Sequence, residues 1–294
     1  MHSLRTLVGL TLIAAAPAAM LSQITVAFEN RHIQTDANTT PVVGYVFYAT
    51  VEGVDGLTEE PTVKVGAGAT STLEWDTDGY YEFQDEMPNN LGNALAKYPF
   101  AESYTIGTNK GSVVIPGPGL NTYGTTMPAP VKFSISGVTG SWAGNVFRFD
   151  PNSGDSFTVT MNNYSATSPG GVYAYYMDVW NDDFEFEQGD GPVTYDSGAE
   201  FEAPVFTFMK GTAADSDAFD DTFGFSNNSL FHMEGGFFNG IGFGYNADLG
   251  ADVGFVVGTT TFFTLQAIPE PSTYAAIFGA LALAGVVVHR RRRA

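Results

Sequence analysis

The fold class is decided by the stretch Val253-Gly254-Phe255-Val256-Val257-Gly258-Thr259-Thr260-Thr261-Phe262-Phe263-Thr264-Leu265. It is filled with β-branched and aromatic residues, which fit strands better than helices. Similar runs recur along the chain with Gly, Pro, Asn and Asp between them, at 24–28, 42–51, 131–135, 146–149, 157–161, 172–179, 205–208, 230–238 and 241–245. The body of the chain is therefore predicted to be all-β.

Several of these runs alternate between an aromatic residue and a polar or small one, as in Phe147-Arg148-Phe149, Phe184-Glu185-Phe186 and Phe243-Gly244-Tyr245. Such alternation is typical of antiparallel strands with one face in water. The modest helix candidate is 89–98, which Pro99 closes, and no βαβ rhythm appears. We expect an antiparallel β-sandwich, jelly-roll-like in its connections.

The body is expected to occupy residues 23–266, with one internal boundary to consider. A stretch rich in proline and glycine runs from 116 to 130. It is either a linker between two β domains or a long loop that crosses between the sheets of one domain. One domain is the preferred interpretation, because the segment before this stretch contains few strong strands of its own.

Composition limits the classes of function. The 294 residues include no cysteine, which excludes disulfides and thiolate chemistry, and 14% are aromatic, enough to build a core. The formal net charge is −20. A surface this acidic repels the phosphates of nucleic acid, so no nucleic-acid partner is expected.

The end of the sequence carries a short polar motif, Pro269-Glu270-Pro271, then an uncharged apolar segment at 275–288. A cationic cluster follows, formed by Arg290, Arg291, Arg292 and Arg293. An apolar helix that ends in adjacent arginines stops in a membrane with the arginines on the cytoplasmic side. Fourteen residues make a helix of only about 21 Å against a hydrocarbon core of about 30 Å, a mismatch that snorkelling arginines and local thinning can absorb. We therefore expect a single transmembrane helix at 275–288, with the arginines as its membrane stop.

This arrangement resembles the PEP-CTERM sorting signal of bacterial exported proteins, and it covers residues 268–294. The resemblance implies an exosortase as a partner, removal of the tail at or near the motif, and delivery to the cell surface or an exopolysaccharide-rich matrix. The catalytic residues for that processing belong to the exosortase. The resemblance assigns no family to the body of the chain.

The beginning of the sequence agrees with export. Arg5 precedes an apolar stretch at 7–19, which is typical of the helix of a secretory signal peptide, here assigned to residues 1–22. The small residues Ala16 and Ala18 suit cleavage after Ala18, and cuts near Ser22 or after Ala27 stay open. The Sec translocon and a signal peptidase are the expected partners.

Side chains suited to catalysis are few, and no catalytic residue is predicted. Within the body only His32 and His232 could serve as a histidine base, and neither accompanies a Gly-x-Ser-x-Gly motif. Oxygen ligands for a structural Ca²⁺ ion are candidates at Asp76, Asp78, Asp215 and Asp217, although Asp also forms turns without metal. No other cofactor is expected.

Tryptophans are the candidates for stacking against carbohydrate: Trp75, Trp142 and Trp180. The alternative role for each is that of an ordinary core or edge aromatic residue. The sequence favours a non-enzymatic protein that is exported, held first in the inner membrane by its C-terminal helix and then associated with exopolysaccharide. The alternative is an exported polysaccharide-active hydrolase or lyase that uses two of the many carboxylates.

Overall fold

The computed structural model describes residues 22–76, 79–119, 127–162, 172–181, 185–194, 204–211 and 222–268. Its largest unit is a ten-stranded sheet. The strands along this sheet are, in spatial order, β14 (Glu185–Thr194), β13 (Val172–Trp180), β17 (Leu230–Asn246), β18 (Ala251–Ala267), β1 (Gln23–Ile33), β2 (Val42–Glu52), β6 (Tyr80–Pro88) and β5 (Glu74–Trp75). Two further strands, β10 (Gly140–Ala143) and β11 (Val146–Phe149), join it beside β18.

Two four-stranded sheets accompany the large one. The first has the order β4 (Thr70–Thr72), β3 (Thr62–Val65), β7 (Ser103–Thr108) and β8 (Gly111–Pro116). The second has the order β16 (Thr222–Phe225), β15 (Val205–Lys210), β12 (Ser156–Asn162) and β9 (Lys132–Ser136). Most neighbouring strands in all three sheets run antiparallel, which confirms the expected mostly antiparallel β architecture.

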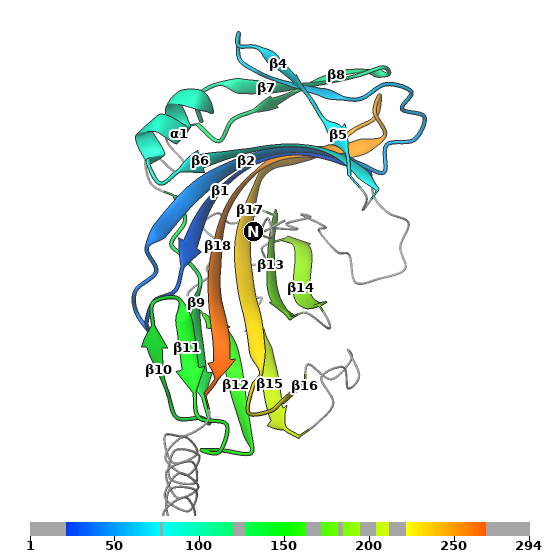
Figure 1. Ribbon diagram of the computed structural model, residues 1–294. Coiled ribbons are helices and arrows are strands. Elements are labelled where there is room, and N and C mark those ends of the chain that lie inside the picture. Colours follow the sequence, from blue (N-terminus) through cyan, green and yellow to red (C-terminus); the bar gives the residue numbers. More distant parts are fainter. Residues whose placement is uncertain are drawn as a thin grey trace, which may run out of the picture.

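The hairpin of β17 and β18 lies in the middle of the large sheet and runs along its length (Figure 1). Each strand has 17 residues, so each is about 56 Å long at about 3.3 Å per residue. The edge of β18 opposite β17 pairs with two strands in succession. β1 pairs with it in parallel up to Phe262, and β11 pairs with it in parallel from Thr264 onward.

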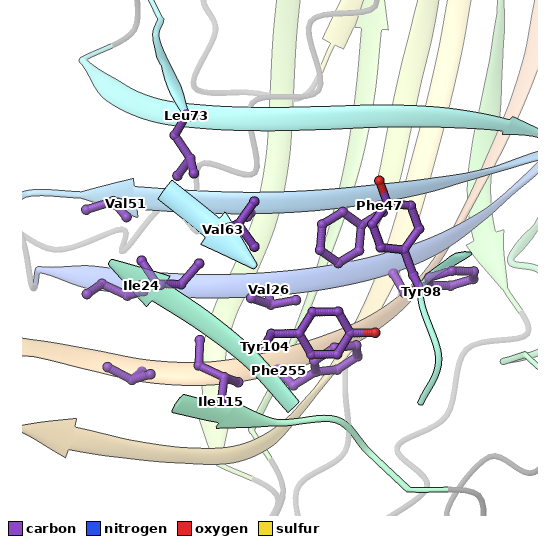
Figure 2. Close-up of a cluster of buried hydrophobic side chains, with 14 of the residues drawn as sticks. Ile24, Val26, Phe47, Val51, Val63, Leu73, Tyr98, Tyr104, Ile115 and Phe255 are labelled. Carbon is purple, nitrogen blue, oxygen red and sulfur yellow. The ribbon is translucent and has the colours of Figure 1, made fainter. Parts of the chain in front are cut away.

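Both small sheets pack on the same face of the large sheet, which we call the outer face. Val257 of β18 contributes to the core under the first small sheet, and Phe263 of the same strand contributes to the core under the second. Residues six apart in an unbroken strand point to the same side. In Figure 2, side chains of β1, β2 and β18 meet Val63, Tyr104 and Ile115 from the first small sheet. The opposite face of the large sheet is called the inner face.

Polar contacts lie at the boundary between the two cores, which is covered by the end of the proline-rich stretch and the residues that follow it. Gln34 donates to the carbonyl of Phe133 and accepts from its N–H, both at 2.7 Å. Thr261 donates to the carbonyl of Val131 at 2.9 Å, and Asn30 donates to that of Pro128 at 3.2 Å. The chain therefore crosses the outer face here on its way to β9.

Among the described residues the structure has one helix, α1 (Leu91–Lys97), inside the predicted range 89–98. Asn90 caps it by accepting from the N–H of Asn93 at 2.9 Å, and the helix ends at Lys97, with Tyr98 as its C-cap just before Pro99. Within the described part of the chain, no helix is long and apolar enough to cross a membrane. The expected signal helix and the expected transmembrane helix at 275–288 lie outside the described residues.

Candidate functional site

A pocket of about 390 Å³ lies beside the end of α1, where β6 and β2 of the large sheet meet the first small sheet. We call it the α1 pocket. It is lined by Phe47, Val63, Val65, Gly66, Ala67, Gly68, Ala69, Ser71, Phe83, Ala96, Lys97, Tyr98, Pro99 and Glu102. It has the size of a small-molecule site, for which volumes of about 300 to 1,000 Å³ are usual.

The floor of the α1 pocket is aromatic. Phe47 of β2 stacks face to face on Tyr98, with ring centroids 3.9 Å apart, and Phe83 of β6 packs against Phe47 at 6.2 Å. Figure 2 shows the rings of Phe47 and Tyr98 side by side. The end of α1 positions this floor, because Tyr98, whose ring completes it, is the C-cap of the helix.

The wall of the α1 pocket facing the first small sheet is made of small residues. Residues 66–69 read Gly-Ala-Gly-Ala, and Gly66 has φ of +49°, a conformation that favours glycine. A Cβ at Gly66 would lie 2.6 Å from a carboxylate oxygen of Glu102. Short side chains in this loop therefore keep the pocket open and leave the Glu102 carboxylate at its rim.

The polar rim is organised around Asp85. Its Oδ2 accepts from the Tyr98 hydroxyl at 2.6 Å and pairs with the ammonium of Lys97. Burial, together with the hydrogen bond to Asp85, raises the pKa of Tyr98, so the phenol stays protonated and acts as a donor. Ser71, Lys97 and Glu102 add polar groups around the aromatic floor.

Trp75 stands next to this pocket on the edge strand β5. Its side chain is 60% exposed, and its ring meets Tyr81 of β6 edge to face at 4.8 Å. Trp75 pairs with Tyr81 across the strands, and Phe83 follows Tyr81 by two residues on β6. The three aromatic residues therefore share the outer face of the large sheet, in a row that leads into the α1 pocket.

A second candidate is a cluster of charges buried on the inner face, which we call the inner-face cluster. Arg31 of β1 contacts Glu29 with Nε–Oε1 3.4 Å, contacts Glu86 with Nη1–Oε1 2.9 Å, and donates from Nη2 to the hydroxyl of Tyr48. The side chains of Arg31 and Glu29 are only 10% and 1% exposed. Burial lowers the pKa of Arg31, but Glu29 and Tyr48 outweigh this effect and leave the pKa raised, so the guanidinium stays charged.

The same face carries a half-buried tyrosine and a buried glutamate from the neighbouring strands. Tyr176 of β13 donates a short hydrogen bond to Glu234 of β17. Its ring covers Gly236 and stacks on Phe238 at 5.8 Å, and Phe238 in turn covers Gly258. Burial and the nearby carboxylates raise the pKa of Tyr176, which keeps this hydroxyl protonated.

Glu82 of β6 extends the acidic character of the inner face. Burial raises its pKa to about 7, and the neighbouring charge of Asp76 adds to the rise against a hydrogen bond from Tyr80 and the charge of Arg31. A carboxyl group with a pKa near 7 suits a general acid. The inner-face cluster offers carboxylates and phenols, while the α1 pocket offers shape and aromatic surface.

The predicted stacking tryptophans have different surroundings. Trp75 is exposed, as a platform for a ligand requires, whereas Trp142 packs against Phe147 and Phe263 in the second core. Trp180 is half-buried and stacks on the ring of His232 at 5.5 Å. The three side chains therefore do not form one surface.

The calcium and sorting residues fall mostly outside the structure. Asp76 is described, while Asp78, Asp215, Asp217, the motif Pro269-Glu270-Pro271 and Arg290, Arg291, Arg292 and Arg293 lie outside the described residues. In the part of the chain that is described, no three His, Cys, Asp or Glu side chains come together in a way that could hold a metal ion.

Sequence reasoning missed the residues of both candidate sites other than Trp75. The sequence signal for the inner-face cluster was weak: Glu29-Asn30-Arg31-His32 directly follows an apolar strand, but nothing in this polar run marks its residues as buried. The α1 pocket had no comparable signal, since its lining comes from β2, β3, β6, α1 and the loops around them.

Comparison with known proteins adds no family. No family model and no curated protein matches the chain. Among solved structures, a cytokine receptor complex is similar over 77% of this chain and 94% of that one, at 12% identity and a TM-score of 0.21. A TM-score this low carries no argument about fold or function.

Proposed function

We propose that the chain is an exported, non-enzymatic protein that an exosortase processes at the motif Pro269-Glu270-Pro271. After processing it resides at the cell surface or in the extracellular matrix, associated with exopolysaccharide. In this proposal a signal helix leads the precursor to the Sec translocon, the transmembrane helix 275–288 holds it in the inner membrane, and the exported body is a β-sandwich.

The observation that carries the proposal is the position of the motif relative to the last strand. β18 ends at Ala267, and the N–H of Ile268 still donates to the carbonyl of Phe149 at 2.9 Å. Pro269 follows at once. Cleavage at the motif would therefore leave every described strand intact, which is what a removable sorting tail requires.

The other end supports export in the same way. Ser22 donates to the carbonyl of Gly53 at 2.6 Å, and Ile24 and Val26 are fully buried in the first core. Cleavage after Ala27 would remove these core residues, whereas cleavage after Ala18 leaves β1 whole. We therefore propose cleavage before β1, after Ala18 or near Ser22, and not after Ala27.

The alternative function, a polysaccharide-active enzyme, is favoured by one observation: the raised pKa of Glu82 on the acidic inner face. Glu82→Gln separates the two functions. A hydrolase or lyase that uses Glu82 would lose turnover in a glycan screen, whereas a binding protein shows no turnover before or after the change.

The sorting proposal is tested by replacing Pro269, Glu270 and Pro271 with alanine in a host that contains an exosortase. Immunoblots of the membrane and extracellular fractions should show the variant retained in the membrane at precursor size. The matched control replaces Pro128 and Pro130, which lie in the body. Release of the motif variant at the same rate as the control would reject processing at the motif.

A further inference from the structure

We propose that the α1 pocket and the Trp75–Tyr81 pair together form a binding site for a neutral oligosaccharide. The inference rests on the proposed association with exopolysaccharide and gives that association a location on the body. One sugar unit occupies the pocket, and the glycan continues along β6 to Trp75.

The exposure of Trp75 is the first argument. The side chain of Trp75 is 60% exposed and therefore leaves a large apolar surface in water. Its contact with the ring of Tyr81 covers only part of the indole. Such a surface favours a partner that presents apolar C–H groups together with hydroxyls. The faces of a sugar ring have this chemistry.

The α1 pocket supplies the second argument. Its lining combines aromatic and aliphatic side chains on the floor with Ser71, Lys97 and Glu102 at the rim. Phe47 and Tyr98 are buried and form the base beneath the pocket, so the apolar surface that a ligand can reach comes from half-buried Phe83 and Val65. A ligand with one apolar face and a girdle of hydroxyl groups suits this lining, because Phe83 takes the apolar face and the rim groups take the hydroxyls. The register places both halves of the site on one face of β6, which gives a single track for a chain-like ligand.

Charge selects a neutral glycan over an anionic one. The formal net charge of −20 repels polyanions over the whole surface. Lys97 is already paired with Asp85 at the rim, so its charge is partly compensated there. Glu102 at the rim accepts hydrogen bonds, which suits hydroxyl donors and opposes carboxylates or sulfates.

The test uses isothermal titration calorimetry of the full-length chain with hexasaccharides of β-1,4-glucose, β-1,3-glucose and β-1,4-mannose, and with an oligomannuronate as the anionic probe. Trp75→Ala removes the platform, and Ala69→Phe fills the pocket from the small-residue loop. Tyr245→Ala is the matched control, because this aromatic residue is 70% exposed on β17, away from the site. Circular dichroism verifies that each variant is folded.

We expect at least one neutral hexasaccharide to bind. Both site variants should weaken its binding by about tenfold or more, as for aromatic anchors in other interfaces, and the control should stay within about twofold. The inference is overturned if no neutral glycan binds, if the site variants bind as the unchanged chain does, or if the oligomannuronate binds better. It is also overturned if sedimentation shows that Trp75→Ala only separates two copies of the chain. These outcomes leave the processing at the motif untouched, since that is read from the size of the protein in each fraction.

Discussion

Replacing Arg31 with methionine tests how much the guanidinium of the inner-face cluster contributes to the stability of the fold. Methionine keeps an apolar stem of similar length but removes the charge that faces Glu29 and Tyr48. Glu29 is then left 1% exposed without a cation. Breaking a buried ion pair from one side costs about 3–5 kcal/mol of unfolding free energy.

Protonation sets a ceiling on this loss. A glutamate with an ordinary pKa of about 4.3 can be neutralised at a cost of about 1.4 kcal/mol for each pH unit above that value. The ceiling is therefore about 3.7 kcal/mol at pH 7 and about 1 kcal/mol at pH 5. The lost contact with Glu86 adds little, because that side chain is 64% exposed. We expect Arg31→Met to lose about 3–4 kcal/mol at pH 7 and about 1 kcal/mol at pH 5.

The assay is urea denaturation followed by tryptophan fluorescence at both pH values, with the double variant Glu29→Gln/Arg31→Met as the control. The double variant carries no charge at positions 29 and 31, so it should recover most of the stability at pH 7. A loss below about 1 kcal/mol at pH 7, an equal loss at both pH values, or a double variant as unstable as the single one would refute the reasoning.

Three further changes follow from the packing and the pKa shifts. Gly258→Ala should lower the free energy of unfolding by about 1–3 kcal/mol in thermal or urea unfolding, because the new Cβ would lie 2.1 Å from the Phe238 ring. The control Gly244→Ala should be close to neutral, because its Cβ meets nothing within 4 Å. Equal effects of the two substitutions would contradict this account. Burial lowers the pKa of His32 against the hydrogen bond from Nδ1 to Thr40, so the unfolded chain takes up the proton first and stability should fall as pH drops below about 6.5. His32→Asn should remove that part of the pH dependence, and a pH profile of unfolding free energy that the substitution does not alter would argue against it. Asn90→Ala should cost about 1 kcal/mol through loss of the α1 cap, measured by urea unfolding against Asn89→Ala, which makes no cap and should change stability by less than about 0.5 kcal/mol.

The sequence predicted strands well where apolar alternation continued, and poorly where a strand continued through polar residues. The predicted run 24–28 stops at Phe28, but β1 continues to Ile33 through Glu29, Asn30, Arg31 and His32. All four are buried, and two of them have distant partners: Tyr48 for Arg31 and the Pro128 carbonyl for Asn30. Partners 17 and 98 residues away leave no mark on the local pattern.

Strand ends were misplaced for a related reason. Asn239-Gly240 has the composition of a turn and separated two predicted runs at 230–238 and 241–245. Both residues lie inside β17, where β13 and β18 pair with the strand from its two sides, and the irregularity falls later, at Gly242 with φ of +65°. Pairing on both edges outweighed the local turn preference.

The candidate site was only partly predictable. Trp75 could be singled out by residue type, and it is exposed, but its stacking role stays a prediction. The α1 pocket depends on the end of a helix, a loop of small residues and the register of β6 against β2, none of which forms a motif. Residue type alone does not identify a stacking residue, because Trp142, another of the predicted stacking tryptophans, packs against the second core.

The measurement that tests the central claim most directly is the intact mass of the protein recovered from the extracellular or cell-surface fraction, with peptide mapping of both ends. The account predicts a chain that begins after Ala18 or near Ser22 and ends at or near Pro269-Glu270-Pro271, with the strands from β1 to β18 complete. Recovery of the whole 31.4 kDa chain from the cytoplasm, with Arg290 to Arg293 still attached, would contradict it.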